Sequence, residues 1–294
     1  MLRATRERRV MRRFGGECSM SMTILELVKP RPDWLGALQI ALTRPPGVPE
    51  RRAGEDPWSP DADRPRRVSD DLAWFRPALD DRGFAQTEPV LDAAECAALA
   101  AQFDDGRFRS RVDMRRHRFG EGEYKYFDAP LPAVVDEARH ALYPPLAALA
   151  NDWAGRLGEE AEYPAELDAF LARCHAAGQT RPTPLILRYF EGGHNTLHQD
   201  LYGDIAFPLQ AVTILNRAGT DFEGGQFVLV EQRPRAQSRA HVIELERGAF
   251  AIFPTRTRPV EGSRGHYRTT MRHGVATVHA GERITLGIIF HDAA

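Results

Sequence analysis

The segment from residue 184 to 200, PLILRYFEGGHNTLHQD, opens the part of the chain that decides the fold. It begins with the apolar and aromatic run Leu185–Tyr189, passes two glycines, and ends on His198 and Asp200. Short β-prone runs bounded by glycine are typical of strands. Residues i and i+2 share one face of a strand, so His198 and Asp200 at a strand end can point at one ion together.

Similar runs follow to the end of the chain, separated by Gly, Pro and Asp. The predicted strands are Leu185–Tyr189, Leu209–Leu215, Gly225–Val230, Ala240–Leu245, Ala249–Phe253 and Arg283–Phe290. Runs of this length and spacing favour an antiparallel sandwich or jelly roll. We therefore expect an α+β fold with a mainly β core.

The region before residue 184 is predicted to be mainly helical. Asp92 predicts the N-cap of a helix over Ala93–Phe103, with Glu95 at the capping-box position. Apolar residues at helical spacing predict further helices over Pro130–Leu157 and Ala165–Ala177. Two short strands are expected, at Gly83–Thr87 and Tyr124–Phe127. We expect a single domain over residues 68–294, with a helical support region (68–183) packed on a β core (184–294).

Residues 1–67 carry clustered arginines and then a Pro/Asp/Arg-rich run, Pro45–Arg67, with little to bury. They predict a disordered or weakly structured leader. Trp34–Leu42 is one short helix candidate within it.

Composition limits the location and the partners of the chain. The formal net charge of −2 provides no global attraction to nucleic acid or to acidic membranes. No apolar run approaches the roughly 20 residues that span a bilayer, so no membrane partner is expected. Cys18, Cys96 and Cys174 are odd in number and widely spaced, which favours a reducing compartment and a cytoplasmic location.

A third metal ligand must come from another strand, and the candidates are His273 and His279. We favour His273 because Arg283 follows it by ten residues. His279 is only four residues from Arg283, which is too close for one to bind a metal while the other binds the far end of a dicarboxylate. Two histidines and one carboxylate form the facial ligand set of non-haem Fe(II). A planar, always charged guanidinium suits a carboxylate. The pattern predicts an iron enzyme with a small dicarboxylate co-substrate.

Residues 184–294 resemble the Fe(II)/2-oxoglutarate-dependent dioxygenases, whose core is a double-stranded β-helix. The resemblance to the prolyl 4-hydroxylase pattern rests on Arg188-Tyr189-x-x-Gly192-Gly193, His198-Gln199-Asp200, Gly224-Gly225, His273–Val275 and Gly281–Arg283. More closely, Phe119–Ala294 is similar to a bacterial oxygenase family described as acting in oxidative demethylation of damaged DNA. The segments that carry this similarity are Leu197–Gly203, Glu231–Arg235 and Leu286–Asp292.

The resemblance implies a role for each matched residue. His198, Asp200 and His273 would bind Fe(II), and Arg283 would pair with the distal carboxylate of 2-oxoglutarate. Tyr189 would donate a hydrogen bond to the co-substrate. Thr285, on the strand face of Arg283, would replace the serine of some relatives, with an ordinary strand threonine as the alternative. The other reactant would be O₂, and ascorbate is a further candidate cofactor.

The sequence motifs say less about which residues contact the substrate. Asn195 and Tyr202 flank the ligands and are candidates for the substrate pocket, with simple packing around the ligands as the alternative. Arg272 is a candidate because it adjoins His273. The other arginines between Glu231 and Arg272 form either a basic rim or an ion-paired sheet edge.

Three functions remain open. The first is oxidative demethylation of alkylated nucleobases, and the second is prolyl-hydroxylase-like C-hydroxylation of a peptide or small molecule. The first is weakened by Leu187, where DNA-repair relatives carry asparagine, and by the spacing from His273 to Arg283. The third is a non-catalytic jelly roll that binds a ligand, which a complete ligand set disfavours.

Overall fold

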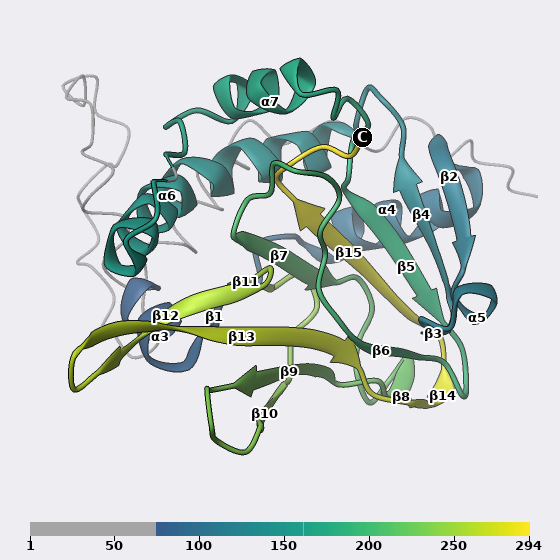
Figure 1. Ribbon diagram of the computed structural model, residues 1–294. Helices are drawn as coiled ribbons and strands as arrows, with labels where there is room; N and C mark the ends of the chain where they lie inside the picture. Colours follow the sequence, from purple (N-terminus) through teal and green to yellow (C-terminus); the bar gives the residue numbers. More distant parts are fainter. Residues whose placement is uncertain (1–74, 161) are drawn as a thin grey trace, which may run out of the picture.

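The computed structural model describes residues 75–160 and 162–294 (Figure 1). The expected leader, residues 1–67, and its candidate helix Trp34–Leu42 lie outside the described residues. None of the helices that the structure describes is both long and apolar enough to cross a membrane.

Two antiparallel sheets face each other (Figure 1). The order of the larger sheet is β1 (Ala85–Gln86), β11 (Phe250–Pro254), β7 (Leu209–Ile214), β15 (Arg283–Ile289), β5 (Leu185–Tyr189), β4 (Glu123–Phe127) and β2 (Phe108–Asp113). The order of the smaller sheet is β10 (Arg239–Ile243), β9 (Phe227–Gln232), β13 (Gly265–Val275), β6 (His194–His198) and β3 (Gly120–Glu121), and β12 (Thr257–Gly262) also pairs with β13. A separate pair joins β8 (Phe222–Gly224) to β14 (Val278–Gly281).

From β5 onward the chain alternates between the two sheets. Strands β5, β7, β11 and β15 lie in the larger sheet, and β6, β9, β10 and β13 lie in the smaller one. This winding is the double-stranded β-helix, or jelly roll, and it confirms the expected fold class.

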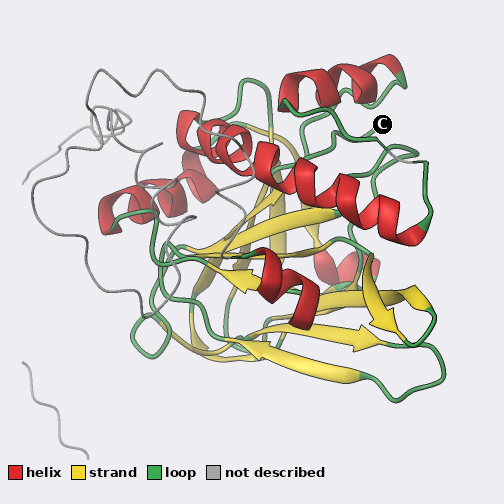
Figure 2. Cartoon of the chain, turned by 90° about the vertical axis from the view of Figure 1, so that its left-hand side faces the viewer, coloured by secondary structure: helices red, strands yellow, loops and turns green. Residues whose placement is uncertain are grey.

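Helices cover one side of the sandwich (Figure 2). These are α4 (Ala93–Asp105), α6 (Ala133–Leu157) and α7 (Leu167–Ala176), whereas α3 (Arg76–Arg82) lies beside β12 and α5 (Met114–His117) beside β3. Helix α4 begins as predicted: the Asp92 side chain accepts hydrogen bonds from the backbone N–H groups of Ala94 and Glu95, and the Glu95 carboxylate accepts one from that of Asp92. This reciprocal capping box satisfies donors that a helix start otherwise leaves unpaired.

The centre of the larger sheet is buried on both faces, which explains the composition of its central strands. Every residue of β7, β11 and β15 is buried. Along β15, Ile284, Leu286 and Ile288 join the apolar core beneath the helices. Because side chains alternate along a strand, Arg283 and Thr285 face the interior of the sandwich instead.

Most of the predicted elements are present with ends shifted by up to three residues, but three strands of six or more residues were missed, namely β2, β12 and β13. Strands β12 and β13 lie in a segment rich in arginine and polar residues, where no strand was expected. The support region contributes strands as well as helices, because β4 pairs with β5 and β3 pairs with β6.

The expected ion-paired arginines are present in part. Arg258 is fully buried, and its Nη2 lies 3.1 Å from Oε1 of Glu231, which also accepts from Arg233 Nε at 2.9 Å. Cys96 is buried in the helical core, and burial raises the pKa of its thiol to about 12, so it is inert at neutral pH.

Candidate metal centre and co-substrate site

The three predicted ligands converge inside the sandwich. His198 is the last residue of β6, and its register partner in β13 is His273. Asp200 follows two residues beyond the end of β6. Its Oδ2 lies 3.1 Å from His273 Nε2, and its Oδ1 lies 3.6 Å from His198 Nε2. One ligand atom of each residue lies within 4.8 Å of the others, so the three can hold one metal ion.

Two neighbouring groups fix the orientation of these ligands. His198 Nδ1 donates a 2.7 Å hydrogen bond to the Thr196 carbonyl, which leaves Nε2 free to bind a metal. The hydroxyl of Tyr202 donates a 2.7 Å hydrogen bond to Asp200 Oδ1. Tyr202, expected as a substrate contact, therefore supports a ligand.

The electrostatics favour the metal-binding protonation states. Burial raises the pKa of Asp200, but the charges of His273 and His198 and the hydrogen bonds from His273 and Tyr202 outweigh it, so the net pKa lies well below its usual range. Burial and the neighbouring His273 lower the pKa of His198. At neutral pH the site therefore offers an ionised carboxylate and a neutral His198, as a divalent metal requires.

Arg283 lies deep in the same interior, and its side chain is almost completely buried. Nη1 donates to Thr285 Oγ1, and the guanidinium carbon lies 5.6 Å from the centroid of the Tyr189 ring. Nε has no hydrogen-bond partner among the described residues. Burial lowers the pKa of Arg283 to about 10, so the group stays charged at neutral pH. A buried, charged and incompletely bonded guanidinium fits a carboxylate ligand.

Tyr189 lies beside Arg283 in the interior of the sandwich. It is buried on β5 as the register partner of Arg283, and its hydroxyl accepts a long hydrogen bond, 3.4 Å, from Asn195 Nδ2. Burial raises the pKa of Tyr189 to about 12, so its hydroxyl is protonated and able to donate.

A cavity of about 200 Å³ connects these groups. Of the predicted site residues, it brings together His198, Asp200, His273, Arg283, Tyr189, Thr285, Asn195 and Tyr202. Arg272 does not line it. This side chain is exposed, and strand alternation places it on the opposite face of β13 from His273. A substrate contact by Arg272 stays a prediction, without support from this cavity.

Several lining residues were not predicted. They include the apolar walls Val212, Phe227 and Phe253 and the polar side chain of Gln210. The centroid of the Phe253 ring lies 4.9 Å from that of the His273 ring, so Phe253 forms the cavity wall next to the metal ligands. Gln210 stands within an apolar strand run, and this interruption was the signal in the sequence that could have identified it.

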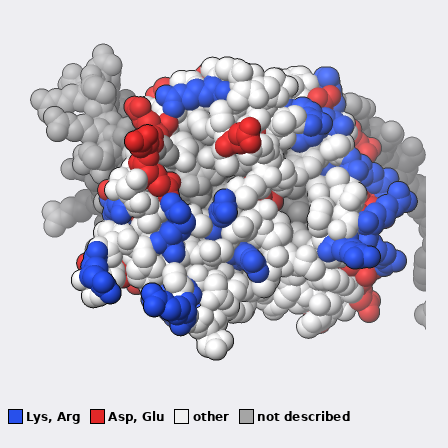
Figure 3. Space-filling model, viewed as in Figure 1, with Lys and Arg blue, Asp and Glu red and all other residues white. Residues whose placement is uncertain are grey.

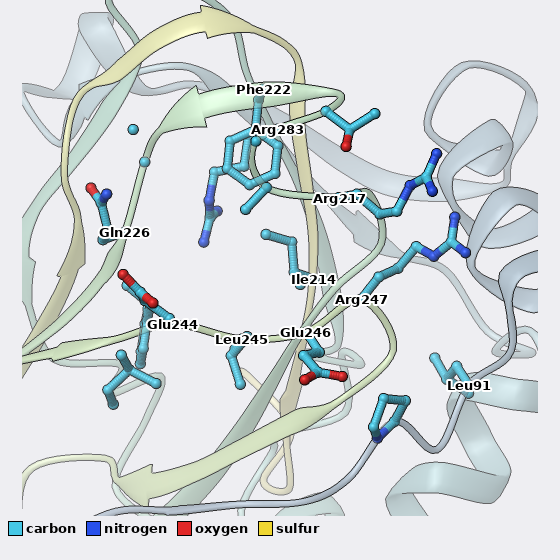
Figure 4. Close-up of a pocket in the computed structure, with 18 of the residues that line it drawn as sticks. Leu91, Ile214, Arg217, Phe222, Gln226, Glu244, Leu245, Glu246, Arg247 and Arg283 are labelled. Carbon is cyan, nitrogen blue, oxygen red and sulfur yellow. The ribbon is translucent and has the colours of Figure 1, made fainter.

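A second cavity, of about 950 Å³, reaches Arg283 from the other side (Figure 4). Its rim carries Arg217 and Arg247, whose side chains lie close together, with Glu244 and Glu246 further round. Arg283 and Phe227 line both cavities and so form part of the wall between them.

Sequence comparison identifies the family. Residues 122–293 match the model of a family described as "Oxygenase, catalysing oxidative methylation of damaged DNA". The chain belongs to this oxygenase family. Two uncharacterized proteins of Mycobacterium tuberculosis, from strains H37Rv and CDC 1551, are each 48% identical to it over 190 residues, covering 65% of this chain and 79% of theirs.

Solved structures give weaker matches. A prolyl-4-hydroxylase of Pseudomonas putida is 19% identical, with a TM-score of 0.43, and the match covers 76% of this chain and 99% of that one. A 2OG-Fe(II) oxygenase family oxidoreductase of Burkholderia pseudomallei has the same identity and TM-score, with 76% and 93% covered.

Proposed function

We propose that this chain is an Fe(II)- and 2-oxoglutarate-dependent oxygenase that removes methyl groups from alkylated nucleobases by oxidation. The observation that carries the proposal is the convergence of His198, Asp200 and His273 in one cavity with the buried guanidinium of Arg283. Two imidazoles and one carboxylate suit Fe(II) and leave coordination positions for reactants.

The chain's own residues bind and orient the reactants. Arg283, held by Thr285, binds the distal carboxylate of 2-oxoglutarate, and the Tyr189 hydroxyl donates to the same molecule. Phe227 and Phe253 exclude water on the side of the metal ligands. When bound, Fe(II) and O₂ supply the oxidation of a substrate C–H bond, coupled to decarboxylation of 2-oxoglutarate to succinate and CO₂.

The family description supports a nucleic-acid substrate, and the oxygenase chemistry defines the direction of the reaction. Oxygen insertion converts an N-methyl group to N-hydroxymethyl, which loses formaldehyde and restores the N–H bond. We therefore infer loss, rather than addition, of methyl groups.

The surface at the cavity mouth supports the same substrate. Phe119 lines the cavity, is 46% exposed and stacks on His117, with 5.5 Å between ring centroids. Exposed aromatic rings of this kind suit the stacking of unpaired bases. Basic side chains gather beside it over α5 and β2 (Figure 3). The exposed basic residues of this patch are Arg107, Arg111, Arg115, Arg116 and Arg118.

Four of these five arginines form ion pairs within the protein, including Arg107 with Asp128 and Arg116 with Asp113. Arg115 pairs with Glu121, and Arg111 Nη2 lies 2.5 Å from Glu123. The side chain of Arg118 makes no ion pair with any described residue, so it is the arginine of this patch best suited to a phosphate.

The test uses the full chain, loaded anaerobically with Fe(II). Addition of 2-oxoglutarate should produce a visible charge-transfer absorbance, and admission of air should release succinate. A methylated oligonucleotide should stimulate succinate release and yield formaldehyde, whereas the unmodified oligonucleotide should not. His198→Ala serves as the blank. Stimulation by proline-containing peptides alone would replace demethylation with peptide hydroxylation. Absence of both the absorbance and succinate release would contradict an oxygenase and support a non-catalytic jelly roll that binds a ligand.

A further inference from the structure

Gln210 is a buried polar residue in the wall of the metal cavity. It lies on β7 and is 3% exposed. Its inward-facing neighbour along the strand is Val212, and its register partner in β11 is Phe253, the residue whose ring contacts His273. The glutamine therefore stands beside the metal ligands rather than in the outer core.

The amide of Gln210 is unsatisfied. Its Nε2 is buried and has no hydrogen-bond partner among the described residues. Buried polar groups of folded proteins are nearly always hydrogen-bonded, because an unmade bond costs stability. An apolar residue of similar size would fit this strand run better. Because an unpaired buried amide destabilises the fold, its presence in the reaction cavity indicates that it hydrogen-bonds a ligand.

The distal carboxylate of the co-substrate does not account for this amide. The register partner of Gln210 in β15 is Ile289, and Arg283 lies six residues away on that strand. Six residues of strand span about 20 Å between the two backbones, so Gln210 lies toward the metal end of the cavity, away from the distal carboxylate that Arg283 would hold. The amide is not a ligand of the facial set either. The C–H bond of the prime substrate has to lie at the metal, beside Gln210, so we assign this amide to the prime substrate; a raised KM for 2-oxoglutarate in place of the oligonucleotide would contradict this assignment.

We propose that Gln210 is a specificity-determining residue that hydrogen-bonds the edge of the substrate base. The inference rests on the proposed function. An amide presents one acceptor and two donors side by side, so it pairs in a bidentate way with a base edge where an amino group adjoins a ring nitrogen. Adenine offers this edge, so Gln210 selects for adenine-type substrates over thymine-type ones.

The test compares Gln210→Leu and Gln210→Glu with the matched control Thr213→Val. Thr213 lies on the same strand, is equally buried and also has no partner for its hydroxyl, but its register partner Leu286 belongs to the helix-side core. Gln210→Leu should raise the KM for a methylated-adenine oligonucleotide about 10- to 100-fold, the loss expected for one bidentate base contact. Gln210→Glu, which keeps the shape but loses the donor, should show a similar loss.

Two readouts separate recognition from a structural role. Succinate formation without prime substrate reports on the metal and co-substrate sites alone, and the control Thr213→Val should leave it unchanged. The Tm of Gln210→Leu should be equal to or above that of the wild type, because an unpaired buried amide has been removed. An unchanged KM would contradict the proposal, as would a lower Tm with an equal loss of substrate-free turnover.

The failures of the two proposals are distinguishable. Absence of any 2-oxoglutarate turnover in the wild type contradicts the proposed function itself. Normal turnover with an unchanged KM in Gln210→Leu contradicts only the assignment of Gln210. A Gln210-dependent KM for a peptide, and not for the oligonucleotide, overturns the assignment to a base edge.

Discussion

The hydroxyl of Tyr202 donates a 2.7 Å hydrogen bond to Oδ1 of Asp200, the carboxylate of the metal site. Partners behind a metal ligand orient it, and their loss typically weakens metal binding 10- to 100-fold. Tyr202→Phe should therefore lower Fe(II) affinity by about that factor in an anaerobic titration. Tyr143→Phe is the control, because the Tyr143 hydroxyl is buried without a described partner. Equal affinities of the Tyr202 and Tyr143 variants would refute a supporting role for Tyr202.

Arg283→Lys tests the co-substrate site. Lysine keeps the charge but lacks the planar fork that binds a carboxylate with two hydrogen bonds. The KM for 2-oxoglutarate should rise at least about tenfold while Fe(II) affinity stays the same. Arg188→Lys, one residue before Tyr189 on β5 and paired with Asp104, should leave this KM unchanged. A matching rise in the control would mean that the sheet, and not the guanidinium, had been disturbed.

Gly225 approaches Arg283 too closely for any side chain. A Cβ there would lie 2.8 Å from Arg283 Cδ, and the residue has φ +62°, in the left-handed region. Gly225→Ala should shift the arginine and raise the KM for 2-oxoglutarate. Gly219→Ala provides a matched control for backbone strain, since Gly219 has φ +74° but no atom within 4 Å of the added Cβ. If both variants lose stability equally and neither changes the KM, the contact at Gly225 has no role in binding.

The buried side chain of His291 should make the free energy of unfolding depend on pH. Its Nδ1 accepts a 3.1 Å hydrogen bond from the backbone N–H of Phe207, and burial lowers its pKa to about 4 from the ordinary 6.5. Between these values the unfolded chain binds a proton that the folded chain does not. Stability should therefore fall as the pH falls from 6.5 to 4, by on the order of 3 kcal/mol.

Denaturant unfolding of metal-free protein at pH 7 and pH 4.5 measures this effect. His291→Gln should show a smaller loss of stability over this range than the wild type. His117→Gln, at an exposed position, should behave as the wild type. Parallel losses in all three proteins would assign the acid sensitivity to other groups.

The sequence predicted the three residues that converge at the candidate metal site, because Arg283, ten residues beyond His273, distinguished that histidine from His279. It also predicted the start of α4, since Asp92 and Glu95 act locally. It did not predict β13, whose exposed face is rich in polar residues. Without that strand, the opposite orientations of Arg272 and His273 could not be foreseen.

Gln210 was missed for a different reason. Its significance depends on the absence of a hydrogen-bond partner and on the position of a cavity, and both follow from contacts between distant strands. The supporting role of Tyr202 also depends on tertiary structure, because the conformation of the loop after β6 directs its hydroxyl back to Asp200. Local pattern identified the reactive groups, and the packing of the sheets determined what surrounds them.

The register between His198 and His273 has a further consequence for folding. A metal ion bound to both would cross-link two strands separated in the chain by everything from Gln199 to Arg272, including β7 and β9 to β12. Closing so long a loop is an entropic cost of folding, and a ligand that binds only the closed form favours it. A bound metal would therefore also stabilise the β-helix, so the iron-loaded protein should unfold at a higher denaturant concentration than the metal-free protein.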